Sequence, residues 1–120
     1  MEKRQNPILD KSMAFAIRIV NLYKYLKVNL SEYIMSKQLL RSGTSIGANV
    51  RESVYAQSRA DFNTKLYIAL KEANESAYWI ELLEKTGYLK QHQAKSILDD
   101  CNELIKILSS ITKTVKDKPI

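Results

Sequence analysis

The spacing of apolar residues predicts four helices and no strands. Over almost the whole chain, apolar positions recur at intervals of three and four residues, which is typical of helices that bury one face. We expect helices over residues 8–27, 32–56, 59–85 and 91–115. Proline occurs only at positions 7 and 119, so none interrupts these segments, and this scarcity of turn residues argues against a sandwich or a barrel.

Helix-boundary signals separate the predicted helices by short connections. Asn29 or Ser31 could cap the second helix, with Glu32 close to its positive end. The run from Ser58 to Asp61 is a capping-box pattern before the third helix, and Gly87 suits a left-handed turn after it. Four long helices with short links predict an all-α protein, an antiparallel up-down-up-down four-helix bundle in which residues 1–120 form a single domain.

The last helix has the most regular apolar stripe. It comprises Ala94, Ile97, Leu98, Cys101, Leu104, Ile105, Leu108, Ile111 and Val115. Cys101 occupies a core position in this stripe, so we expect it to pack as an inert apolar group. A single cysteine allows no intrachain disulfide, and together with the lack of a signal peptide this favours the cytoplasm.

The first helix carries two apolar stripes on different sides. One comprises Met13, Ala16, Ile17, Val20 and Tyr23, and the other comprises Phe15, Ile19, Leu22 and Leu26. One stripe suffices for a helix in an isolated bundle. We therefore expect the stripe of Phe15, Ile19, Leu22 and Leu26 to be an interface with another copy of the chain. The alternative is one wide core face with some exposed apolar surface.

Small residues interrupt the second helix between Ser42 and Asn49. Gly43 and Gly47 lie four residues apart and share a helix face, although each costs roughly 1 kcal/mol relative to alanine in a helix interior. We expect this track to let a neighbouring helix approach closely. A loop from Ser42 to Gly47 is the alternative, but the apolar spacing continues across the run and favours a helix.

Glu75 stands close to the buried stripe of the third helix. That stripe comprises Phe62, Leu66, Ala69, Leu70, Ala73, Ala77, Ile80 and Leu83. Arg41 or Arg51 could form a buried ion pair with Glu75, which would fix helix register. A solvated glutamate is the alternative.

The sequence contains no recognisable catalytic or metal-binding pattern. His92 is the only histidine, and no Glu-x-x-His pair occurs, so the usual zinc and carboxylate-bridged metal sites are not expected. The run from Gly43 to Gly47 lacks the lysine and the preceding strand of a phosphate-binding loop. No apolar run is long enough to span a membrane. We expect neither enzyme activity nor a cofactor, and no membrane partner.

The positive charge is concentrated in the first half of the chain. Net charge is +6; residues 1–60 hold 10 basic and 4 acidic side chains, whereas residues 61–120 hold 9 of each. A basic half predicts binding of RNA or DNA through phosphates, without reading base sequence. The candidate contacts are Arg18, Lys24, Arg41, Arg51, Arg59 and Lys65. Charge that serves only solubility is the alternative, and the protein would then be a protein–protein adaptor.

Several runs resemble one protein family. They are Gln38 to Asn49, Ala60 to Phe62, Lys65-Leu66, Ala69 to Ala73, Glu75-Ser76, Tyr78-Trp79 and Thr86 to Leu89. Together they resemble the four-helix bundle proteins encoded in intervening sequences of bacterial large-subunit ribosomal RNA genes, over roughly residues 8–113. The resemblance implies a homo-oligomer, a pentameric ring, with no enzyme activity. A related branch, the accessory variability determinant of diversity-generating retroelements, binds a reverse transcriptase and nucleic acid.

The residues that match the family motif are interpreted as structural. They are Arg41, Ser42, Ser45, Gly47, Asn49 and Glu52, and we place Gly43 and Glu75 with them. We expect them to provide close packing and a buried polar network that fixes helix register. A binding role for the same residues is the alternative.

Overall fold

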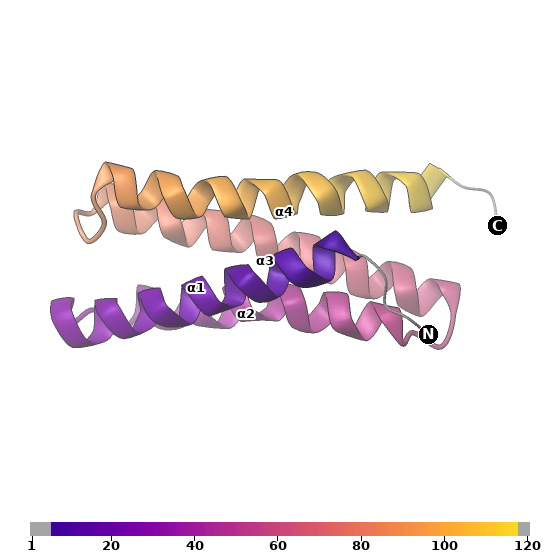
Figure 1. Cartoon of the computed structure of the whole chain (residues 1–120), viewed down its shortest axis with the longest axis horizontal. Coiled ribbons are helices and arrows are strands. Elements are labelled where there is room, and N and C mark those ends of the chain that lie inside the picture. Colours follow the sequence, from indigo (N-terminus) through magenta and orange to yellow (C-terminus); the bar gives the residue numbers. More distant parts are fainter. Residues whose placement is uncertain (1–5, 118–120) are drawn as a thin grey trace.

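The chain folds into four antiparallel helices. The computed structural model describes the backbone of residues 6–117 and the side chains of residues 6–114. Figure 1 shows the helices in chain order: α1 (Pro7–Leu30), α2 (Met35–Val54), α3 (Arg59–Lys85) and α4 (Gln91–Asp117). The all-α prediction is confirmed, and the α3 bounds agree with the sequence. Helix α1 ends three residues later than expected. The Val115 side chain lies outside the described residues.

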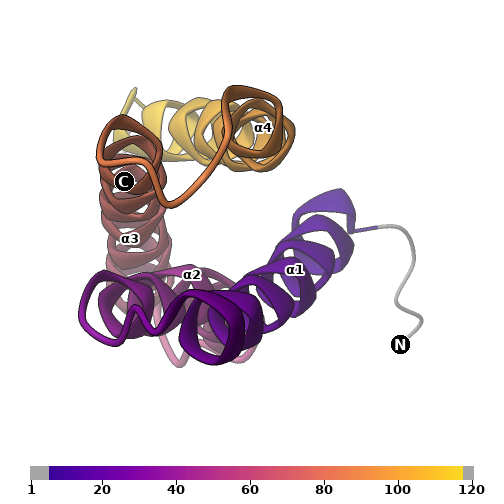
Figure 2. The ribbon, with the colours of Figure 1, turned by 90° about the vertical axis from the view of Figure 1, so that its left-hand side faces the viewer.

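The four helices do not pack with equal closeness. Helix α2 packs along both α1 and α3, and α3 packs along α4, whereas α1 and α4 contact each other only sparsely. Figure 2 shows the resulting separation of α1 from α4. Two ion pairs bridge this edge, Lys11 with Glu103 at 3.0 Å and Arg18 with Asp100 at 2.8 Å. The bundle is therefore packed closely on three edges, and two ion pairs bridge the sparsely packed fourth edge.

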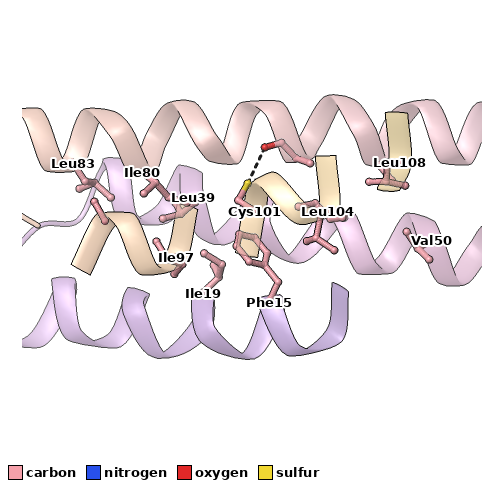
Figure 3. Close-up of a cluster of buried hydrophobic side chains, with 14 of the residues drawn as sticks. Phe15, Ile19, Leu39, Val50, Ile80, Leu83, Ile97, Cys101, Leu104 and Leu108 are labelled. Carbon is pink, nitrogen blue, oxygen red and sulfur yellow. Dashed lines mark hydrogen bonds between the residues drawn. The ribbon is translucent and has the colours of Figure 1, made fainter. Parts of the chain in front are cut away.

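The core contains apolar side chains from all four helices, as Figure 3 shows. Cys101 is fully buried, and its thiol donates a hydrogen bond to the Ala73 carbonyl oxygen at 3.3 Å. Burial, with smaller contributions from Asp100 and Glu81, raises the pKa of the Cys101 thiol to about 12. The predicted packing role of Cys101 agrees with this position.

Helix α1 presents to the core the stripe that we expected to face outward. Phe15, Ile19 and Leu26 have exposed fractions of 1%, 0% and 0%, and Leu22 is half-buried. Figure 3 shows Phe15 and Ile19 pointing toward α4 residues of the core. The prediction that these four residues form an outer interface is wrong. Both stripes have helical spacing, so spacing alone could not decide which of them the other helices would cover.

Two of the predicted helix boundaries are confirmed by hydrogen bonds and backbone angles. The Ser58 hydroxyl oxygen accepts from the backbone N–H of Asp61 at 3.0 Å, which caps α3. Gly87 follows α3 with a φ of 89°, the left-handed conformation that glycine adopts without a steric cost. The turn between α3 and α4 is therefore specified locally by the sequence.

The turn between α1 and α2 depends on Glu32 rather than on Asn29 or Ser31. The Glu32 carboxylate accepts backbone N–H groups of Ile34, Met35 and Ser36 at 3.1, 3.0 and 2.7 Å. Glu32 is 6% exposed, while Ser31 adopts a φ of 53° at the end of α1. The prediction that Asn29 or Ser31 caps α2 is wrong, because Glu32 satisfies the free N–H groups itself.

The bonds to Glu32 make the stability of the protein depend on pH. Burial alone would raise the pKa of Glu32, but the backbone N–H groups of Met35, Ser36 and Ile34 favour the carboxylate, so its pKa lies below the usual 4.5. Because the pKa of Glu32 is lowered in the folded state, its charge stabilises the fold at pH values above the unfolded-state pKa. This stabilisation is lost as the pH falls through the folded-state pKa.

We predict that Glu32→Gln lowers the free energy of unfolding by about 1–2 kcal/mol at neutral pH, because hydrogen bonds to a charged acceptor become neutral ones. Urea unfolding at pH 7 and at several values below pH 4.5 measures this effect. The difference between the parent and the variant should shrink as pH falls. A difference that stays constant across this range would contradict the role of the Glu32 charge.

Candidate functional site

The glycines of α2 lie against α1. A Cβ atom on Gly43 would come within 2.8 Å of Cγ1 and 2.9 Å of Cγ2 of Ile19. A Cβ atom on Gly47 would lie 3.3 Å from the Ser12 hydroxyl oxygen. Helix α2 is continuous across both glycines. The predicted helix is confirmed here, and the close approach that we expected of this track is present in the structure.

On its other side, α2 contacts α3 through a pair of buried serines. The Ser76 hydroxyl lies within hydrogen-bonding distance of the Ser42 hydroxyl oxygen, at 2.9 Å, and both residues have an exposed fraction of 0%. The Ser76 hydroxyl also lies 2.9 Å from the Glu72 carbonyl oxygen. The Ser42 hydroxyl lies 3.4 Å from the Leu39 carbonyl oxygen, so each serine also has a partner within its own helix. The contact between the two serines is a buried polar contact between the facing sides of α2 and α3.

Arg41 connects α2 to two carboxylates on α3. Its guanidinium forms an ion pair with Glu72 at 3.1 Å and another with Glu75. Trp79 Nε1 donates to Glu75 at 2.9 Å, and this bond, followed by the bond from Arg41, holds the pKa of Glu75 below its usual range. The structure thus pairs Glu75 with Arg41. However, the Arg41 side chain is 48% exposed, so the pair is not the buried one that we expected.

Three other motif residues, Ser45, Asn49 and Glu52, form hydrogen bonds or an ion pair that are not part of a buried polar network. The Ser45 hydroxyl donates to the Arg41 carbonyl oxygen at 2.7 Å, and the Asn49 amide donates to the Ser45 carbonyl oxygen at 2.9 Å, both within α2. Glu52 is exposed and pairs with Lys65 at 3.0 Å. The buried polar contact between helices therefore comes from Ser42 and Ser76, not from the whole motif.

The six basic candidates do not form one surface. Arg18, Arg41 and Lys65 each form an ion pair with an acidic side chain. Lys24 lies near the C-terminal end of α1, whereas Arg51 and Arg59 lie beside the connection between α2 and α3, at the opposite end of the bundle in Figure 1. Contact of these six residues with nucleic acid therefore stays a prediction, and charge counted along the sequence does not show which acidic partners neutralise it.

A different group of basic residues lies in and beside the α1–α2 and α3–α4 turns, which are at the same end of the bundle in Figure 1. We call this group the lysine end: Lys24, Lys27, Lys37, Lys85 and Lys90. Among the described residues, none of the five forms an ion pair within 4.0 Å. Three acidic residues lie at the same end: Glu81 and Glu84 on α3, and Glu32, whose carboxylate is buried against backbone N–H groups. The five lysines outnumber them. The end therefore keeps an excess of positive charge.

The outer face of α1 is the second unusual surface. Met13 and Ile17 are 48% and 55% exposed, and Val20, which continues the same stripe, is half-buried. This face lies opposite the buried stripe of Phe15, Ile19 and Leu26. The sequence prediction of two apolar stripes on α1 is thus correct in number and reversed in orientation.

Within the described residues, two kinds of feature are not found. Residues 6–114 hold no group of three or more His, Cys, Asp or Glu side chains that could bind a metal ion. None of the described helices is both long and apolar enough to cross a bilayer. His92 is exposed in the first turn of α4.

Comparison with known proteins places this chain in one family. The 23S rRNA-intervening sequence protein family matches residues 4–110. A crystal structure of a protein of unknown function from the S23 ribosomal protein family of Bacteroides thetaiotaomicron superposes with a TM-score of 0.89 and 60% sequence identity, covering 91% of this chain and 97% of that one. A search of curated proteins finds no match. The chain belongs to the 23S rRNA-intervening sequence protein family.

Proposed function

We propose that the protein is a non-enzymatic, homo-oligomeric scaffold of the cytoplasm that binds RNA or DNA through the lysine end. The observation that carries this proposal is the group of five lysines without ion-pair partners among the described residues. Arg18, Arg41 and Lys65 are held by carboxylates, so they are less available to phosphates. A lysine ammonium on a flexible stem contacts phosphates without requiring one geometry.

Glu32 is bound by backbone N–H groups and not by the lysines of this end. Between Lys24 and Lys37 it is the only acidic residue, and its carboxylate accepts three backbone N–H groups. The remaining ionisable groups of this turn include Lys24, Lys27 and Lys37. A surface of this kind binds phosphate polymers by releasing counterions, so its affinity should fall steeply with salt.

We propose that copies of the chain associate through the outer face of α1. Burying Met13 and Ile17 in an interface would be favourable, because both apolar side chains are exposed to water in a single chain. The family resemblance favours a ring of five. An oligomer presents several lysine ends to one polymer, and this multiplies the strength of individually weak contacts.

Exposed apolar residues at the α1–α2 turn favour a second candidate, a protein–protein adaptor. Val28, Tyr33 and Ile34 are 75%, 55% and 77% exposed. An exposed apolar cluster of this kind is typical of a site that binds another protein. In this case the lysines around the cluster would serve solubility.

We predict that Ile17→Glu dissociates the oligomer, because it places a charge in the proposed interface. Asn102→Glu, which adds a negative charge on an exposed position of α4, is the matched control and should leave the mass unchanged. Light scattering measures the mass, and circular dichroism confirms that both variants stay helical. An Ile17→Glu variant with the mass of the parent would remove the interface.

We predict that Lys24→Glu, Lys27→Glu and Lys37→Glu together abolish most binding of ribosomal RNA fragments and of unrelated DNA. The slope of log affinity against log salt is negative, and its magnitude should decrease by about 2–3, roughly one for each phosphate that these lysines no longer neutralise. The matched control reverses Arg51, Arg59 and Lys113 to Glu, outside the lysine end.

Fluorescence anisotropy over a salt series gives both slopes. Equal losses of affinity in the two triple variants would show that binding depends on total charge and not on the lysine end. If the intact oligomer binds no nucleic acid even at low salt, the nucleic-acid function is wrong and the adaptor remains.

A further inference from the structure

A groove lies between α1 and α4 on their sparsely packed edge. Its volume is about 480 Å³, within the range of small-molecule sites. Leu22 from α1, Leu89 from the α3–α4 turn and Ile97 from α4 line it with apolar side chains, and Leu89 and Ile97 are only 4% exposed. The groove therefore offers an apolar surface at the same end of the bundle as the lysines.

One wall of the groove combines an aromatic ring with a fixed cation. Tyr25 is 38% exposed and lines the groove from α1, between Lys24 and Lys27 in the sequence. Arg18 lines the groove earlier on α1, and its guanidinium is oriented by Asp100 at 2.8 Å and by the Ser96 hydroxyl at 3.0 Å. Because Asp100 pairs with Arg18, the negative charge of Asp100 is largely balanced beside the groove.

The opposite wall is the first turn of α4. His92 and Gln93 line the groove from this turn, which contains no acidic residue. The Gln93 side-chain oxygen accepts the Lys90 backbone N–H at 2.8 Å, so its amide N–H groups are oriented away from that bond. The N-terminus of a helix attracts anions, and Lys90 precedes it directly.

We infer that this groove binds a single nucleotide, with the base against Tyr25 and the apolar floor and the phosphate toward the first turn of α4. Aromatic stacking and helix N-termini are the usual protein groups for base and phosphate. The nucleotide is either free or an unstacked unit of a bound single strand, and the second source rests on the proposed nucleic-acid binding. Bases in a duplex are already stacked and paired, so a duplex should not enter the groove.

Proton NMR can test this directly, because His92 is the only histidine and its imidazole protons give one pair of signals that is assigned without mutation. The probes are a nucleoside monophosphate, a short single-stranded RNA and a duplex of the same length, with inorganic phosphate as a further control. We expect the monophosphate and the single strand to shift the His92 signals, and phosphate and duplex to shift them much less.

Tyr25 variants separate stacking from charge. Tyr25→Ala should weaken single-strand binding by roughly five- to hundredfold, while Tyr25→Phe, which keeps the ring, should retain it. Tyr55→Ala is the matched control, since Tyr55 is an exposed tyrosine beyond the far end of α2. Circular dichroism and urea unfolding of Tyr25→Ala distinguish the loss of stacking from a folding defect, because a correctly folded variant keeps the helical signal of the parent.

Each outcome decides one of the two claims. If a single strand binds without shifting the His92 signals, the inference of a nucleotide in the groove is wrong. The same holds if the strand binds Tyr25→Ala and Tyr55→Ala equally. Neither result contradicts binding at the lysine end. A shift by the free monophosphate without any polymer binding supports the groove and overturns the proposed function. Inorganic phosphate that reproduces the full shift overturns the inference of a nucleotide, because no base would then be required.

Discussion

The contact of Ile19 with Gly43 determines how α1 lies in the bundle. Ile19 is fully buried, and its side chain occupies the space that a Cβ atom of residue 43 would need. Interiors packed at this density tolerate little added volume. Further along α2, Gly47 lies beside Ser12 in the same way. This track brings α1 close to α2, and the edge between α1 and α4 is left with polar bridges and a groove.

The two proposed surfaces follow from this placement. With Phe15, Ile19 and Leu26 turned inward, Met13 and Ile17 of the second stripe face solvent and become available to another copy. The α1–α2 turn is then organised by the Glu32 carboxylate, which is enclosed by backbone N–H groups. Residues 24–37 hold three lysines against this one acidic residue, so the net charge of the turn is positive.

Local signals predicted the helices well, and contacts between distant residues were harder to foresee. Gly87 and the Ser58 cap act within a few residues, so their patterns are readable in the sequence. Cys101 falls in a regular stripe for the same reason. In contrast, the inward stripe of α1 depends on which face α2 accepts, and spacing carries no information on that choice. The Arg41 pair with Glu75 was predicted, but its exposure was not.

The lysine end shows why the candidate site was only partly predictable. Lys24 was among the candidates, whereas Lys85 and Lys90 lie in the half of the chain whose charges cancel. Only the antiparallel fold brings the two turns to one end. The glycine signal of α2, by comparison, indicated close packing before any partner helix was known, because helix glycines are costly unless something approaches them.

A double-mutant cycle on Gly43 and Ile19 tests most directly whether their contact positions α1. We expect Gly43→Ala alone to lower the free energy of unfolding by about 1–2 kcal/mol, because overpacking outweighs the gain in helix propensity. In an Ile19→Ala background, where the obstructing side chain is gone, the same change should be neutral or stabilising, by up to about 1 kcal/mol. Urea unfolding of the four proteins gives these values. An effect of Gly43→Ala that is the same in both backgrounds would contradict the account.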